Sequence, residues 1–272
     1  MIKNIFNPIL KTTTRKMLAV AFASGTGTNV REALAESKNP KANFSIPLLI
    51  TDKEKIAAVD HAKQFSIDTI TVDGIQHCGS WKELQRTVQG RKEYHERTNT
   101  YNTLLLKKIK QYEQDHQVTF DIAILAKYMR LFTGDLLRRF RGTALNVHPA
   151  DLAARKEGKR IYVGANSVYH TLLAGEKKTR TSIILINKEL DGGPILVSGP
   201  WVKFKGKEVT VETAAVHEEL QKEQSDWPAL RFTLREISLG HFSINNKKYH
   251  DDGTPTVLYK GKELPYEGWV LK

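Results

Sequence analysis

The sequence is poor in cysteine: its 272 residues contain a single one, Cys78. One cysteine cannot form an intramolecular disulfide, so a disulfide-stapled fold is excluded and a reducing compartment, the cytoplasm, is expected. Cys78 and the nine scattered histidines also lack the spacing of a zinc site, and we predict no metal. No uncharged apolar run approaches the ~18 residues of a membrane-spanning helix, so no membrane partner is expected.

Two common catalytic signatures are missing as well. No glycine-rich loop carries a Walker A lysine, and no Gly-x-Ser-x-Gly nucleophile elbow occurs. The chain does contain 40% hydrophobic and 26% charged residues, which is the composition of a globular protein rather than a disordered one. Its length is sufficient for a sizeable core.

Acidic residues are outnumbered, 30 against 42 lysines and arginines, which gives a formal charge of +12. Residues 1–16 carry four basic side chains and no acid, and we predict a disordered basic extension there, with an organelle transit peptide as the alternative. Residues 151–180 carry seven basic against three acidic side chains. Such an excess attracts nucleic acid or small anions. Aromatic residues do not interleave with the basic segments, so nucleic acid is the less favoured partner.

From residue 17 onward, short apolar runs alternate with longer amphipathic ones. The apolar runs predict strands at residues 17–23, 44–51, 69–72, 120–126, 143–147 and 181–186. Helices are expected between them and over 209–239, followed by a hairpin in 241–271. This order predicts an α/β fold with a doubly wound, mostly parallel sheet. We expect one domain over 17–272, with an α/β core at 17–205 and a C-terminal helical and hairpin extension at 206–272.

A glycine loop, Gly25-Thr26-Gly27-Thr28-Asn29, follows the first predicted strand. Ligands of such sheets bind beyond the carboxyl ends of the strands, where glycines admit an anion to the N–H groups of a helix. A dinucleotide fingerprint would need a third glycine at Val30, and Asp52 would then bind the ribose. The missing glycine favours a phosphate monoester, and a tight turn without a ligand is the alternative.

Two further motifs could carry chemistry. Asn146 and His148 stand at positions i and i+2 of a predicted strand, so both side chains project to the same side. The amide can stabilise an oxyanion and the imidazole can carry a proton, although a lone histidine at a strand end is often structural. Asp191 precedes Gly192, Gly193 and a proline, which is typical of a turn. It becomes catalytic only if the fold places it against His148, within hydrogen-bond reach or one water away.

These motifs, in this order and spacing, resemble the phosphoribosylglycinamide (glycinamide ribonucleotide) formyltransferases, a folate-dependent formyltransferase family with a Rossmann-like fold. The resemblance extends from about Met17 to Leu271. It also includes residues 125–131 (LAKYMRL), 189–194 (ELDGGP) and 258–269 (LYKGKELPYEGW).

The resemblance implies formyl transfer from 10-formyltetrahydrofolate to the amine of glycinamide ribonucleotide in purine biosynthesis, with small molecules as partners. It makes Asn146, His148 and Asp191 the catalytic trio and the glycine loop the phosphate site. It assigns folate binding to Arg91, Tyr128, Met129, Arg130 and Leu131. The basic loop after His148 would then lie where a phosphorylated substrate and a polyglutamated folate are both anionic.

The chain also departs from the family pattern. Ala150 begins a longer and more basic loop that runs to Gly164, Arg180 and Lys127 replace glycines, and Ile184 replaces a histidine. These changes leave two alternatives: a formyltransferase for another phosphorylated amine, such as an amino sugar nucleotide, and a non-catalytic relative that binds anions or nucleic acid. The oligomeric state, monomer or homodimer, stays open.

Overall fold

The computed structural model of the chain describes residues 6–9 and 15–272. Its centre is a sheet in which eight described strands have the order β16-β11-β10-β6-β5-β2-β3-β4. Five neighbouring strands run parallel to one another: β6 (Ala144–His148), β5 (Ile122–Leu125), β2 (Met17–Ala23), β3 (Phe44–Thr51) and β4 (Asp68–Thr71). The prediction of a mostly parallel α/β sheet is therefore confirmed.

The other end of the sheet is mixed. β10 (Ser182–Leu185) pairs antiparallel with β6, and β11 (Ile195–Ser198) pairs antiparallel with β10. β16 (Trp269–Val270) from the C-terminal segment closes this edge in a parallel pairing with β11. Because β10 runs antiparallel to β6, its last residue, Leu185, lies opposite Leu145, and the polypeptide that joins β10 to β11 leaves the sheet at the end where β6 begins.

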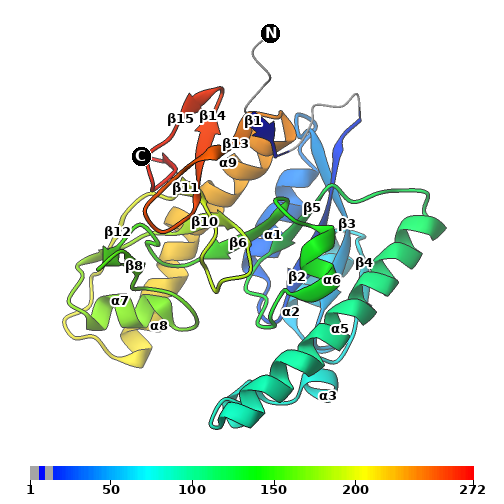
Figure 1. Ribbon diagram of the computed structural model, residues 1–272, viewed down its shortest axis with the longest axis horizontal. Coiled ribbons are helices and arrows are strands. Elements are labelled where there is room, and N and C mark those ends of the chain that lie inside the picture. Colours follow the sequence, from blue (N-terminus) through cyan, green and yellow to red (C-terminus); the bar gives the residue numbers. More distant parts are fainter. Residues whose placement is uncertain (1–5, 10–14) are drawn as a thin grey trace.

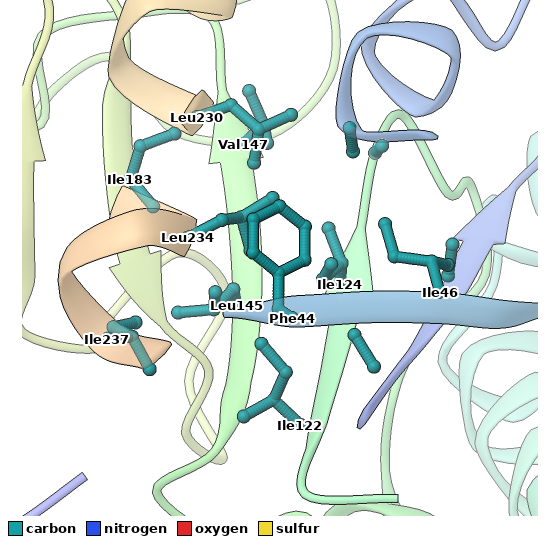
Figure 2. Close-up of a cluster of buried hydrophobic side chains, with 14 of the residues drawn as sticks. Phe44, Ile46, Ile122, Ile124, Leu145, Val147, Ile183, Leu230, Leu234 and Ile237 are labelled. Atoms are coloured by element: carbon teal, nitrogen blue, oxygen red, sulfur yellow. The ribbon is translucent and has the colours of Figure 1, made fainter. Parts of the chain in front are cut away.

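Continuous apolar runs form the central strands because both faces of the sheet are covered by helices. On one face lie α1 (Thr28–Ser37) and α9 (Trp227–Ser238), and Figure 2 shows Leu230, Leu234 and Ile237 of α9 packed among the side chains of the strands. On the other face lie α5 (Val88–Asp115), the longest helix in Figure 1, and α6 (Gly134–Arg139).

The remaining helical elements lie around this core. They are α2 (Ala57–Gln64), α3 (Gly74–Cys78), α4 (Trp81–Leu84), α7 (Ser167–Leu173), α8 (Val211–Gln221) and the π-helical turn η1 (Lys222–Asp226). The predicted helical stretch 209–239 is thus one helical run that the π turn divides into α8 and α9. None of the described helices is both long and apolar enough to cross a bilayer.

The C-terminal segment forms a second, smaller sheet of β13 (Phe242–Tyr249), β14 (Pro255–Tyr259) and β15 (Lys262–Glu263). β1 (Phe6–Pro8) adds to it by antiparallel pairing with β13, and Figure 1 shows these two strands next to each other near the top of the molecule. This part of the predicted disordered extension is therefore a strand. Residues 1–5 and 10–14 of that extension lie outside the described residues.

Two short strand pairs complete the fold. β7 (Arg155–Lys156) and β8 (Lys159–Arg160) form a hairpin inside the long basic loop, and β9 (Lys178–Thr179) pairs with β12 (Val202–Lys203). Both pairs follow β6 in the chain and belong to the half of the molecule that contains the mixed end of the sheet.

Candidate active site

Asn146 and His148 lie in β6 and face Asp191, which lies in the loop between β10 and β11. The Asn146 Nδ2 atom donates to Asp191 Oδ1 at 3.2 Å, and His148 Nδ1 lies 3.4 Å from Asp191 Oδ2. The fold thus brings together three residues from two motifs that are more than 40 positions apart. The expected contact between His148 and Asp191 is present, and it could not be obtained from spacing in the sequence.

The imidazole of His148 is buried, with 3% of the residue exposed, and both of its nitrogens face oxygen atoms. Nε2 lies 2.7 Å from the carbonyl oxygen of Tyr162, opposite the contact of Nδ1 with Asp191. A carbonyl and a carboxylate only accept hydrogen bonds, so the doubly protonated imidazolium is the form that can donate to both. Both ring nitrogens of His148 therefore face hydrogen-bond acceptors.

Asp191 is held in a left-handed backbone conformation, with φ +49°. A residue with a Cβ atom adopts this conformation at a cost of about 1–2 kcal/mol. The Gly164 N–H donates to Asp191 Oδ2 at 2.8 Å, and the Arg160 guanidinium donates to the Asp191 carbonyl. The following turn requires glycine, because a Cβ on Gly193 would lie 1.6 Å from the Leu185 carbonyl oxygen. These contacts define the position of the Asp191 carboxylate.

Three of the contacts around the trio come from the long loop after β6, in residues 160–164. The arginines of this loop are themselves engaged by protein groups. Arg155 pairs with Asp251, and Arg160 donates from Nε to the Tyr266 hydroxyl at 2.8 Å. Among the described residues, Lys156 and Lys159 form no ion pair, whereas the arginines anchor the loop to the C-terminal segment. The expectation that this loop lies near anionic substrates stays a prediction, which now concerns its lysines rather than its arginines.

Arg180, a departure from the family pattern, is engaged in the same way. Its buried guanidinium lies 3.1 Å from Asp151 and 2.8 Å from Glu267. It also lies over the ring of Trp201, 4.4 Å from the ring centroid. Arg180 therefore connects the start of the basic loop to the C-terminal segment.

The glycine loop follows β2 and leads into α1. Gly27 has φ +64°, and a Cβ there would lie 2.5 Å from the Ala58 side chain, so this position needs glycine on both counts. Gly25 faces open space. The first N–H groups of α1, from Thr28 onward, have no acceptor within the helix. Loop and helix together can bind an anionic group such as a phosphate.

The side chain of Asn29 points away from this loop toward η1. Its Nδ2 donates to Asp226 Oδ2 at 3.1 Å, and its Oδ1 is buried without a hydrogen-bond partner among the described residues. Asp226 also accepts from Thr181 and, at 3.4 Å, from Gln221. Burial raises the pKa of the Asp226 carboxyl, while these hydrogen bonds oppose the shift. Nothing in the sequence points to Asp226, because a single acid in a predicted helix carries no signal of its own.

The predicted folate segment follows β5. Tyr128 is buried, with its hydroxyl 3.4 Å from that of Tyr101, and Met129 is 57% exposed. The Met129 N–H donates to Ser24 Oγ at 2.9 Å, and the Leu131 carbonyl accepts from Asn102. The segment is therefore fixed by its backbone directly beside the start of the glycine loop.

Arg130 and Asp52 form a buried ion pair, with Nε and Oδ2 2.8 Å apart. Asp52 is fully buried in this pair, so the alternative in which it binds a ribose is wrong. Arg91 lies at the start of α5, where it is exposed and donates to the Gln85 carbonyl at 2.7 Å. Among the described residues it forms no hydrogen bond or ion pair with the segment from Tyr128 to Leu131.

Lys127, which precedes this segment, has φ +59°, a conformation that glycine adopts without strain. Its Nζ lies 2.8 Å from Oε1 of Glu218 on α8. The structure thus gives a reason why a glycine is usual at this position, and it shows that the lysine extends across to another element.

A cavity of about 570 Å³ lies elsewhere, at the ends of β3 and β4. It is lined by Lys53, Thr71, His77 and Lys108 among others, and by none of the predicted site residues. Within residues 6–9 and 15–272, no three His, Cys, Asp or Glu side chains come together as metal ligands would.

Comparisons with known proteins show which sequences and folds this chain resembles. Phosphoribosylglycinamide formyltransferase of Escherichia coli strain K12 is 22% identical over 254 residues, which cover 93% of this chain and 99% of that protein. The trifunctional purine biosynthetic protein adenosine-3 of Gallus gallus is 25% identical over 186 residues; the match covers 68% of this chain but only 16% of that longer protein.

A solved structure of phosphoribosylglycinamide formyltransferase from Coxiella burnetii has the same fold, with a TM-score of 0.68 at 20% identity, over 95% of this chain and all of that one. The sequence pattern of the formyl transferases matches residues 17–222, which include the glycine loop and all three residues of the trio. The chain belongs to the formyl transferase family.

Proposed function

We propose that the protein transfers the formyl group of 10-formyltetrahydrofolate to the primary amine of glycinamide ribonucleotide, a step of purine biosynthesis. The observation that carries this proposal is the contact of Asn146 and His148 with one carboxylate, that of Asp191. The two relatives named above carry the same activity or pathway in their names. We expect the enzyme to act on small molecules in the cytoplasm.

The trio suits acyl transfer to an amine. The amine nitrogen attacks the formyl carbon, and the carbonyl oxygen becomes an oxyanion. Asn146 has two amide hydrogens; one is donated to Asp191, which leaves the other for the oxyanion. The second donor is the Nε2–H of His148, which now donates to the Tyr162 carbonyl. The substrate oxygen therefore has to replace that carbonyl when the site fills.

Asp191 completes the reaction by moving a proton. The amine loses a proton as its new bond to carbon forms, and the folate nitrogen gains one as its bond to carbon breaks. Asp191 accepts the first proton and relays it to the folate nitrogen, directly or through a water molecule. Its negative charge also stabilises the cationic form of His148, at a separation of 3.4 Å.

The two loops next to the trio place the substrates. The N–H groups that follow Gly25 and Gly27 hold the phosphate of the acceptor. The backbone from Tyr128 to Leu131 lines the folate site, since its side chains are largely engaged within the protein. Arg91 is assigned to the folate as well, at the exposed start of α5. Another phosphorylated amine remains the second candidate acceptor, because Ile184 and Lys127 alter the surroundings of the trio.

The test is formyl transfer by the purified chain with 10-formyltetrahydrofolate and glycinamide ribonucleotide. The His148→Ala variant should lose about a thousandfold in kcat, as expected for loss of an oxyanion donor that also carries charge. His116→Ala, at the far end of α5, serves as the matched control and should retain activity. Formyl transfer that persists unchanged in the His148 variant would rule out this mechanism.

A further inference from the structure

Lys127 lies directly at the start of the glycine loop. Its carbonyl accepts the N–H of Ser24 at 3.3 Å, and two residues later the Met129 N–H donates to Ser24 Oγ at 2.9 Å. The backbone that carries the lysine is therefore tied to the residue that opens the loop. With φ +59°, Lys127 keeps a left-handed conformation although it has a side chain. Such strain at a ligand loop suggests that the side chain has a role there.

The side chain of Lys127 extends from this backbone to α8. Its ammonium lies 2.8 Å from Glu218 on α8, with about half of the lysine side chain exposed. α8 continues directly into η1, which contains Asp226. Asp226 accepts the amide of Asn29, the last residue of the loop. The ion pair thus connects the segment after β5, which is hydrogen-bonded to the start of the loop, to the helical run that contacts the end of the loop.

The ammonium of Lys127 pairs with the carboxylate of Glu218, and a phosphate bound at this loop would compete for that ammonium. Like charges repel each other, so Glu218 without its lysine partner would oppose a phosphate bound nearby. The ammonium of Lys127 cancels this charge and sits on a flexible four-carbon stem with three rotatable donors. A partly exposed ion pair contributes little stability, so its lysine can exchange one anionic partner for another at small cost.

We propose that Lys127 is a specificity-determining residue for the acceptor, and that its ammonium contacts the phosphate of the acceptor when that phosphate occupies the glycine loop. This rests on the proposed function, since it assumes a phosphorylated amine as the acceptor. Lys127 thereby supplies a cation at a position where the backbone conformation itself favours glycine. The contact adds a charge to a phosphate site otherwise built from N–H groups.

The experiment compares Lys127→Met, which keeps the length of the side chain but removes its charge, with Lys127→Arg, which keeps a cation. Lys127→Met should raise KM about tenfold for glycinamide ribonucleotide and by less than about twofold for the dephosphorylated nucleoside. Lys127→Arg should stay within about threefold of the original KM. Lys107→Met is the matched control, because Lys107 is an exposed lysine on α5 that forms no ion pair with any residue that the structure describes. An equal loss on both acceptors would overturn the proposal.

A binding measurement tests the contact between Lys127 and the phosphate independently of the formyl transfer reaction. Titration calorimetry with ribose 5-phosphate needs neither folate nor turnover. We expect Lys127→Met to weaken binding about tenfold and Glu218→Gln to strengthen it, because the lysine then loses its competing partner. If formyl transfer fails but these shifts occur, the phosphate contact stands and the acceptor is a different phosphorylated amine. Unchanged affinity in the Lys127 variant, or no binding to the original protein, would overturn the phosphate contact.

Discussion

Asp191 and Asp226 are two carboxylates that each hold a part of the site, and their surroundings are opposite. Asp191 lies beside the imidazole of His148, and the guanidinium of Arg160 donates to its carbonyl. Asp226 is 2% exposed, and its hydrogen bonds come from the neutral groups of Thr181, Asn29 and Gln221. One acid therefore has cationic groups at its side, and the other has none among its hydrogen-bond partners.

The different surroundings of the two acids indicate different roles in the site. A carboxylate in contact with a catalytic imidazole can exchange a proton with a substrate. Burial raises the pKa of the Asp226 carboxyl and its hydrogen bonds oppose that rise, so Asp226 serves as a fixed hydrogen-bonding group in the interior. We infer that Asp191 performs chemistry whereas Asp226 positions the end of the glycine loop through Asn29.

The largest effect is expected for Asp191→Asn. The amide keeps the size of the side chain but removes the charge that stabilises cationic His148 and the site that accepts the amine proton. We predict a fall in kcat of about a thousandfold with little change in KM, as for other acids that orient a catalytic histidine. Steady-state kinetics measure this, and circular dichroism confirms that the variant folds. Near-original turnover would mean that Asp191 is only a turn residue.

A smaller effect on kcat is expected for the loop after β6, where two arginines should differ in their importance for catalysis. Arg160 donates to the Asp191 carbonyl, whereas Arg155 pairs with the exposed Asp251 and lies over the ring of Tyr266, 4.1 Å from its centroid. Arg160→Ala should lower kcat about tenfold, because the strained backbone of Asp191 loses a charged donor worth about 1.5–3 kcal/mol. Arg155→Ala is the matched control, since exposed ion pairs contribute at most about 1 kcal/mol to stability.

Rescue by the conservative substitution sharpens this test. Arg160→Lys retains a cation near the carbonyl but loses the donor to Tyr266, so it should recover part of the lost kcat. Equal losses of kcat in the Arg160→Ala and Arg155→Ala variants would show that the loop acts on stability alone and not through Asp191.

The sequence predicts the half of the site that depends on local pattern. Continuous apolar runs fix the parallel strands, the i, i+2 spacing places Asn146 and His148 on one side, and the glycine loop follows its strand directly. Family resemblance adds Asp191, whose contact with His148 spans 43 positions. These features depend on residues that are neighbours in the chain or that form a family motif, so they can be predicted from one sequence.

The groups that surround the trio could not be predicted. Arg160 reaches Tyr266, which is 106 positions away, and the pairing of β1 with β13 joins the two ends of the chain. Asp52 pairs with Arg130, which lies 78 positions later in the sequence, and this pairing replaces the predicted contact with a ribose. Contacts over such distances depend on how the loops pack, and no local pattern encodes that packing.

The smallest effect is expected for Asp226→Asn, and it depends on pH. Burial raises the pKa of Asp226 above the ordinary value of 3.8 for an aspartate, so the folded state keeps the proton after the unfolded chain has released it. The stability that this group contributes is complete below that value and is lost as pH rises through the folded-state pKa. Asparagine does not titrate, so the variant should gain stability relative to the original protein as pH rises above about 4.

Urea denaturation midpoints of both proteins across a pH series measure this difference. Thr233→Ser, a small change at another buried polar position on α9, is a control that leaves the pH dependence in place. A stability difference that stays constant from pH 4 to pH 8 would mean that Asp226 is ionised in the fold. The contrast with Asp191 would then fail, because both acids would carry a negative charge.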